Sequence, residues 1–286
     1  MVRLKVFLLF LLGFTMSVCA QGQTEPPVSL TIGGRSIVVP VPGDDFARCD
    51  GINPDWDSAM TSTLPPTNRL LALFGTIADR DAIRDGNSVD FSRNFSIQTI
   101  RSEENREIGT KTFSQVVGGI RKELDLMKGG FDAEYKKLAE QGSEKLSKDL
   151  GVDTSVEFTR PAVLGYFEES ETSLGFTIAM NVGVQSGELS EQSRAVVAAL
   201  IRPVNGRITL LYSAANYKGE SDREEAEHSV KAWGDSITAA NPVVEGSSLF
   251  SGIPKAALIR ALIGLVAALV MVLKKRLSAK STSGPA

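Results

Sequence analysis

The sequence predicts an α+β fold in which an antiparallel sheet is covered by a helical hairpin and a C-terminal helix, followed by one transmembrane helix. In residues 174–184 large apolar residues alternate with small and polar ones, as in a strand with one buried face. The dipeptide Asn205-Gly206 separates two further apolar runs and favours a type I′ hairpin turn. Residues 112–150 and 221–240 instead carry apolar residues at helical spacing.

The N-terminus predicts an export signal. Residues 1–20 combine Arg3 and Lys5 with a short apolar stretch and end on the small residues that a signal peptidase requires. That stretch is shorter than a bilayer span, so cleavage is favoured over an uncleaved anchor. Lipid attachment at Cys19 is an alternative, although Val18 stands where a lipoprotein signal carries a smaller residue.

The exported domain is predicted to cover residues 21–242 and to begin with a hairpin. Residues 28–32 and 35–41 flank Gly33-Gly34, as the strands of a two-residue hairpin do, and we expect them to open the sheet. Residues 42–68 keep no period and contain many turn residues. They therefore predict irregular surface structure in which Trp56 anchors the packing.

Two strands and two helices are predicted next. Residues 69–77 and 90–101 have the composition of strands, and the polar segment DRDAIRDGNSVD between them predicts a loop. Thr112 and Gln115 form a capping-box pattern at the start of a helix that ends before Gly129-Gly130. A second helix should follow over residues 131–150. The two helices form a hairpin that we expect to cover one face of the sheet.

The second half of the domain predicts an antiparallel meander and a last helix. Residues 163–168 should pair with the strand at 174–184, and residues 194–204 with 207–216. The helix over residues 221–240 should begin with a capping box of Ser221 and Glu224 and end at Asn241-Pro242. Trp233 lies in the middle of its apolar stripe, so we expect Trp233 to be buried against the sheet.

The C-terminus predicts a membrane anchor. A linker over residues 243–255 leads to the apolar residues 256–273, which as a helix reach about 27 Å, close to the thickness of a bilayer core. Residues 274–286 form a basic tail that should stay in the cytoplasm and leave the domain outside. A buried core helix is the alternative for 256–273. Small residues share one face of the span and would allow weak self-association; they are Ala257, Ala261, Gly264 and Ala268.

Charge and cysteine content exclude several classes of partner. Eight of the 31 Lys and Arg residues lie outside residues 21–254 and all 34 acidic residues lie inside, so the exported part has a formal charge of −11. Nucleic acid is therefore excluded as a partner, and broad attraction to anionic lipid is disfavoured. Signal cleavage leaves Cys49 as the only cysteine. An inert, half-buried thiol is the simpler interpretation of Cys49, and an intermolecular disulfide is the alternative.

The sequence contains no motif that defines a catalytic centre, so the catalytic residues are unknown, and it predicts neither a cofactor nor a metal. The single histidine, His228, has Glu224 one turn earlier but lacks a second metal ligand. The acidic pairs Asp44-Asp45 and Glu168-Glu169 fall in predicted loops. Five residues suggest a calcium loop by composition, but their spacing lacks the bidentate glutamate; they are Asp79, Asp81, Asp85, Asn87 and Asp90.

The order of elements resembles the PsbP-like α/β sandwich of small exported bacterial domains. The resemblance lies in two strands, a helix pair, a meander and a last helix that carries a tryptophan, including LYSAANYKGESDREEAEHSVKAWGDSITAANP, and covers at most residues 28–242. It implies an accessory or interaction module, since most such domains have that role.

These observations predict a membrane-tethered, noncatalytic extracytoplasmic (periplasmic) domain that acts as a protein-interaction or accessory module of the bacterial cell envelope. The expected location is the inner (cell) membrane, crossed once, with an unidentified protein as partner. The alternative is an envelope enzyme, such as a hydrolase, whose catalytic residues cannot be recognised in one sequence.

Overall fold

A computed structural model describes residues 25–64, 67–87, 89, 91–127, 140, 143–144, 147–148, 153–158, 162–186 and 189–245. The predicted signal, transmembrane span and basic tail lie outside these residues, as does most of the predicted helix over 131–150. Within the described ranges, no helix is both long enough and apolar enough to cross a bilayer.

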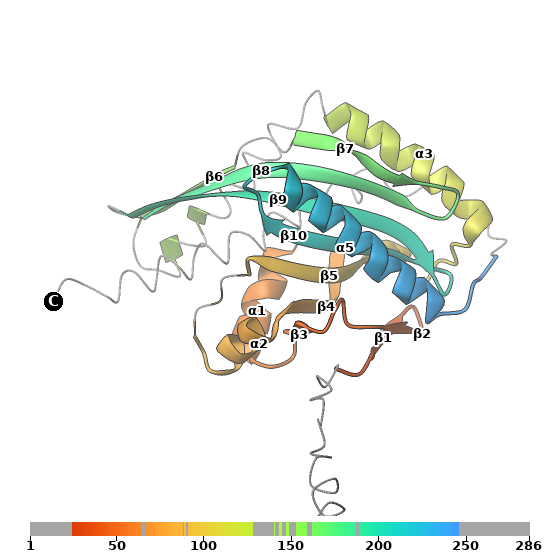
Figure 1. Cartoon of the computed structure of the whole chain (residues 1–286), viewed down its shortest axis with the longest axis horizontal. Coiled ribbons are helices and arrows are strands. Elements are labelled where there is room, and N and C mark those ends of the chain that lie inside the picture. Colours follow the sequence, from red (N-terminus) through yellow and green to blue (C-terminus); the bar gives the residue numbers. More distant parts are fainter. Residues whose placement is uncertain are drawn as a thin grey trace, which may run out of the picture.

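The described chain forms an α+β fold around a large antiparallel sheet (Figure 1). The strand order is β3-β4-β5-β10-β9-β8-β6, and β7 pairs with β8 beside β6. The strands are β3 (Phe46–Arg48), β4 (Asn68–Thr76), β5 (Arg93–Ile100), β6 (Thr154–Phe158), β7 (Ala162–Glu169), β8 (Leu174–Ser186), β9 (Leu189–Val204) and β10 (Arg207–Asn216).

The central hairpins confirm the sequence patterns. Strand β8 pairs with β7 and β9 in antiparallel register, so the alternating segment lies inside the sheet. Asn205 and Gly206 have φ angles of 45° and 70° and connect Val204 directly to Arg207, as a type I′ turn requires.

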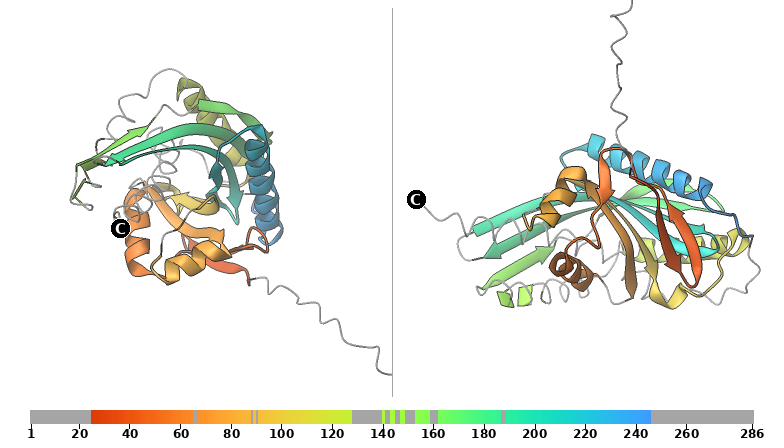
Figure 2. Two further views of the ribbon diagram at one scale, coloured as in Figure 1. Left: turned by 60° about the vertical axis from the view of Figure 1, so that its left-hand side comes forward. Right: turned by 90° about the horizontal axis from the view of Figure 1, so that it is seen from below.

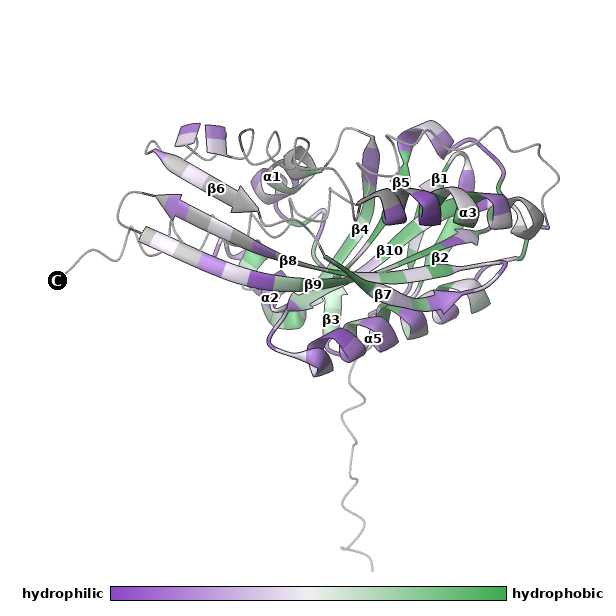
Figure 3. Cartoon of the chain, turned by 90° about the horizontal axis from the view of Figure 1, so that it is seen from above, coloured by the Kyte–Doolittle hydropathy of each residue, from purple (hydrophilic) through white to green (hydrophobic). Residues whose placement is uncertain are grey.

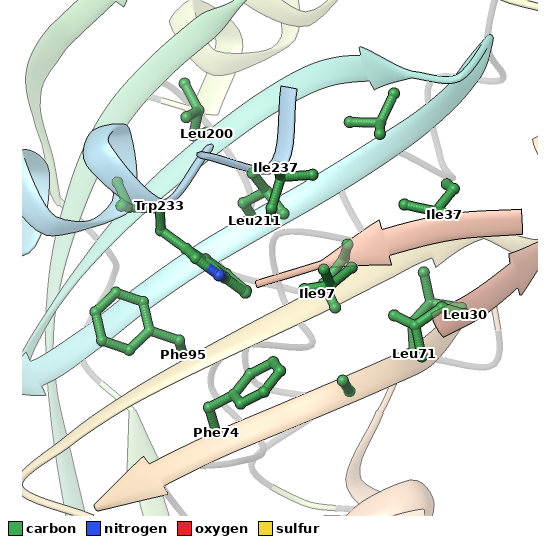
Figure 4. Packing of buried hydrophobic residues seen from close by; sticks show 14 of the residues in the cluster. Leu30, Ile37, Leu71, Phe74, Phe95, Ile97, Leu200, Leu211, Trp233 and Ile237 are labelled. Atoms are coloured by element: carbon green, nitrogen blue, oxygen red, sulfur yellow. The ribbon is translucent and has the colours of Figure 1, made fainter. Parts of the chain in front are cut away.

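The first hairpin forms as predicted but does not join the main sheet. Strands β1 (Val28–Ile32) and β2 (Arg35–Val39) pair only with each other. At the turn, Gly33 has a φ of 51°, and a Cβ there would lie 1.8 Å from the carbonyl oxygen of Glu104. Glycine is therefore needed both for the turn and for the close approach to the segment after β5. The hairpin packs on the main sheet through Leu30 and Ile37 (Figure 4).

Helix α5 (Glu220–Ala239) covers one face of the main sheet next to this hairpin (Figures 1 and 2). Trp233 is buried where helix, sheet and hairpin meet, and its ring forms edge contacts with Phe74 and Phe95 at centroid distances of 5.7 and 5.5 Å. Its indole Nε1 donates to the carbonyl of Pro40 at 2.7 Å. The predicted burial of Trp233 against the sheet is confirmed.

The start of α5 differs from the prediction. The helix begins at Glu220, and the carboxylate of Asp222 accepts hydrogen bonds from the backbone N–H groups of Lys218 and Gly219. The predicted pair of Ser221 and Glu224 does not form the cap. Asp222 is three residues after Gly219, which puts its carboxylate within reach of that N–H group.

Helix α3 (Thr110–Met127) confirms the first predicted helix of the pair. It lies on the opposite side of the sheet from α5 (Figures 1 and 3). Phe113, Val116, Ile120 and Leu124 are buried along one stripe, as the sequence spacing predicts.

Two short helices and one strand occupy segments that the sequence predicts as irregular or loop. Helix α1 (Pro54–Thr63) and β3 lie within residues 42–68. Helix α2 (Ile77–Arg84) begins at the last residue of the predicted strand 69–77 and continues into the predicted polar loop, and a 3-10 turn, η1 (Arg101–Glu103), follows β5. Both helices are short and polar on average, and both are fixed by caps. The side chain of Asn53 accepts hydrogen bonds from the N–H groups of Asp55 and Trp56, and Thr76 pairs reciprocally with Asp79.

Trp56 packs on Phe91 with their ring centroids 5.7 Å apart, as its predicted anchoring role requires.

Candidate functional site

A projecting arm is the most distinctive surface feature of the described chain. Strand β10 pairs with β9 only from Ala195 to Val204, whereas β8 and β9 remain paired out to Ser186 and Leu189. Strand β6 adds a third strand along the outer part of β8. We call residues 154–158, 181–186 and 189–194 the arm; it extends past the rest of the sheet (Figures 1 and 2).

One face of the arm is exposed and rich in uncharged polar side chains. Thr177 of β8 bonds to Glu227 of α5, so by alternation the side chains at 181 and 185 leave the sheet on the side where α5 lies. The exposed polar residues of this face are Ser155, Asn181, Gln185, Ser190, Gln192 and Arg194. Hydroxyl and amide groups both donate and accept hydrogen bonds, so this face can bind a surface of mixed polarity.

Helix α5 leaves the arm uncovered because it starts at the base of the arm and runs the other way. The N–H group of Tyr217, just before α5, donates to the carbonyl of Arg194 at 2.7 Å. The Arg194 guanidinium also lies 4.4 Å from the centroid of the Tyr217 ring. At the other end of the helix, Val244 lies against Gly206, at the opposite end of β9. The arm is thus fixed at its base and free of α5 along its length.

The acidic pair Glu168-Glu169 does not form an acid/base couple. Glu168 accepts a hydrogen bond from Ser173 at 2.8 Å and pairs with Lys231 of α5, whereas Glu169 pairs with Arg121 of α3 at 2.6 Å. Burial acts to raise the pKa of Glu168, but the hydrogen bonds from Lys231 and Ser173 and the charge of Lys231 lower it overall. Its carboxylate therefore links α5 to β7 in ionised form.

The other residues singled out from the sequence are dispersed. His228 and Glu224 are exposed on α5, and Asp44 and Asp45 are exposed in the turn before β3. Cys49 is fully buried, and burial raises the pKa of its thiol to about 12, so the inert interpretation of this cysteine is supported.

The acidic residues between β4 and β5 have structural partners in the described chain. Asp79 caps α2, and Asp81 forms ion pairs with Arg80 and Arg84 at 3.1 Å. Asp90 lies outside the described residues. The part of the chain that the structure describes contains no group of three or more His, Cys, Asp or Glu residues that could hold a metal ion.

Fold and surface together define an α+β domain with a projecting polar arm. No family model and no curated protein matches the chain. Similar solved structures include a mutant of the protein Mog1, with 13% identity, a TM-score of 0.27 and coverage of 77% of this chain and 97% of that one. The Ran-binding protein Mog1p of Saccharomyces cerevisiae has 13% identity, a TM-score of 0.28 and coverage of 77% and 96%. Cyanobacterial PsbP from Synechocystis has 13% identity, a TM-score of 0.23 and coverage of 73% and 86%.

These likenesses are weak. A PsbP structure is among the solved structures found, but its TM-score of 0.23 is too low to test the resemblance seen in the sequence. Identities of 13% and TM-scores below 0.3 assign neither a family nor a function.

The arm was missed at the sequence level. The sequence predicts strands over 174–184 and 194–204 and assigns no element to the polar segment between them. In the structure both strands continue to Ser186 and Leu189. The segment SGELSEQSR has polar residues at both odd and even positions, so it lacks the alternation that marks a strand beside a core.

Proposed function

We propose that this chain is a membrane-tethered, noncatalytic extracytoplasmic (periplasmic) domain that acts as a protein-interaction or accessory module of the bacterial cell envelope. The observation that carries the proposal is the exposed polar face of the arm. Ordering each backbone residue costs about 1–2 kcal/mol, and the exposed face of the arm contributes no buried apolar surface to offset that cost. We therefore interpret the arm as a recognition surface.

The chemistry of the arm fits a protein partner. Gln185 and Gln192 offer amide groups that can pair with backbone or polar side chains on another protein. The exported part as a whole is acidic, which opposes binding to a phosphate backbone. A folded protein surface of mixed polarity is therefore the proposed ligand.

The tether belongs to the same proposal and rests on the sequence. Export by residues 1–20, one span over 256–273 and a cytoplasmic tail over 274–286 would hold the domain outside the cell membrane. Self-association through Ala257, Ala261, Gly264 and Ala268 would be weak, because small residues allow close helix packing but are common in spans of every kind.

The test is site-specific photo-crosslinking of the full-length protein in cells. A photoreactive residue at Gln192, on the arm, should give a defined crosslinked product that the same residue at Ser236, exposed on α5, does not give. Capture from position 192 should be lost when Gln185→Glu and Ser190→Glu are added, because new carboxylates on this face disturb its hydrogen bonding.

Equal capture at 192 and 236, or capture that is insensitive to the two added charges, would show that the arm is not the recognition surface. Circular dichroism of the purified variants establishes that each is folded.

A further inference from the structure

Three large hydrophobic residues are exposed among those whose exposure the structure describes, and two of them lie on segments that Asn241 joins. They are Val38, Ile77 and Val243, with 37%, 40% and 73% of their surface accessible. Val38 lies on β2 and Val243 lies just after α5. Asn241, two residues before Val243, accepts from the Val38 N–H at 2.9 Å and donates to the Val38 carbonyl at 2.7 Å. We call the surface around Val38 and Val243 the exit face.

The exit face is rigidly placed. The Asn241 amide also donates to the carbonyl of Ile237 at 2.7 Å, so the end of α5, the exit segment and β2 are bonded to one side chain. Val244 follows and lies against Gly206 of the β9–β10 turn. The chain therefore leaves the domain at a defined point beside two exposed valines.

Charges near the exit face are largely balanced, in contrast to the acidic domain as a whole. Three glutamates around the two hairpin turns are each paired with an arginine, in Arg35–Glu107, Arg69–Glu104 and Arg106–Glu103. Arg207 adds a further positive charge here and donates to the carbonyl of Gly33 at 3.0 Å. Glu245 is the exposed acid next to Val243. Repulsion from anionic head groups is thus smaller at this end than the net charge of the domain implies.

We propose that the exit face rests on the bilayer surface, with Val38 and Val243 in the interfacial region, and that the arm points away from the membrane. The inference rests on the proposed tether. Ten residues separate Glu245 from the predicted span at 256, and a chain of that length reaches at most about 35 Å. The exit face is the part of the domain that this linker holds nearest to the lipid.

The arm lies at the far end of the same strand. The 16 residues of β9 run from the turn beside Val244 to the tip of the arm, a length of about 53 Å at ~3.3 Å per residue. A domain seated on its exit face therefore presents the arm to partners away from the lipid.

The experiment compares labels on the full chain reconstituted in vesicles of phosphatidylcholine and phosphatidylglycerol. An environment-sensitive fluorophore is attached in separate variants to Val38→Cys, Val243→Cys and Ile77→Cys. Ile77 is the matched control, because it is exposed to the same degree as Val38 but lies at the opposite end of β4 from the exit face. Cys49 is buried, and the chain without an introduced cysteine gives the background labelling.

Lipid-borne quenchers should reduce the fluorescence of labels at 38 and 243 but not at 77. Position 38 is decisive, since position 243 is near the linker in any orientation. Equal responses at 38 and 77 in a chain that floats with the vesicles would overturn the orientation and leave the tether intact. A chain that does not float with the vesicles would overturn the tether, and the inference with it.

Discussion

At the residue scale, Trp233 packs at the point where the last helix, the main sheet and the first hairpin meet. Its ring meets Phe74 of β4 and Phe95 of β5 (Figure 4). Its Nε1 donates to the carbonyl of Pro40, just after β2. One side chain therefore joins the last helix, the main sheet and the first hairpin. His228, five residues earlier on the same helix, is exposed and contributes nothing to this core.

Replacing Trp233 should destabilise the domain strongly, whereas replacing His228 should leave its stability almost unchanged. Trp233→Ala should lower the free energy of unfolding by about 3–5 kcal/mol, because it opens a cavity and removes a buried hydrogen bond. That loss is a large part of the total of about 5–15 kcal/mol typical of a domain. His228→Ala should change the value by less than about 0.5 kcal/mol. Urea unfolding of a fragment of residues 21–242 measures both.

The same histidine separates the proposed function from the enzymatic alternative. A folded, correctly located His228→Ala protein should keep its cellular role. Loss of that role would favour an envelope enzyme, since a histidine is the usual group for proton transfer near neutral pH.

At the element scale, the free edge of β2 is covered by side chains in place of another strand. Asn205 donates to the carbonyl of Ser36 at 2.9 Å, Asn241 bonds both backbone groups of Val38, and Trp233 donates to the carbonyl of Pro40. An open edge is a site for unwanted pairing with other chains. Here side chains from the β9–β10 turn, from helix α5 and from the residue after its C-terminal cap occupy the open edge of β2.

Removal of the Asn241 side chain should loosen this hairpin while leaving the main sheet intact. Asn241→Ala loses three hydrogen bonds to backbone groups and should cost about 1–2 kcal/mol. Hydrogen exchange should become faster at the Val38 amide and stay unchanged at the centre of β9 and β10. The matched control is Ser236→Ala, on the exposed side of α5. Unaltered exchange at Val38 would show that β2 is held by its apolar face alone.

At the scale of the whole molecule, the domain has two distinct ends. The arm occupies one, and the exit face with both tight hairpin turns occupies the other. Because β9 runs the full distance between them, seating the exit face on the bilayer, as proposed above, would direct the arm away from the membrane.

Reporter fusions test that topology. A phosphatase reporter that works only outside the cytoplasm should be active when fused after Pro242, and a cytoplasmic reporter should be active when fused after Ala286. Replacing Lys274, Lys275 and Arg276 with alanine should weaken retention of the tail inside, because these charges form the stop-transfer signal. The reverse pattern of reporter activity would contradict both the tether and the location.

The sequence by itself determined the elements whose residues carry their own signal: the alternating strand from Leu174, the Asn205-Gly206 turn, the stripe of α3 and the stripe of α5 around Trp233. Period and turn chemistry are local, so one sequence suffices to find them. Only the tertiary structure decided that the first hairpin forms a separate sheet, that polar segments close into α1 and α2, and that β8 and β9 extend into an arm. These outcomes depend on partners distant in sequence, such as Val38 and Asn241, which are 203 residues apart. They depend also on the caps of short polar helices and on strand pairing along the polar segment of the arm.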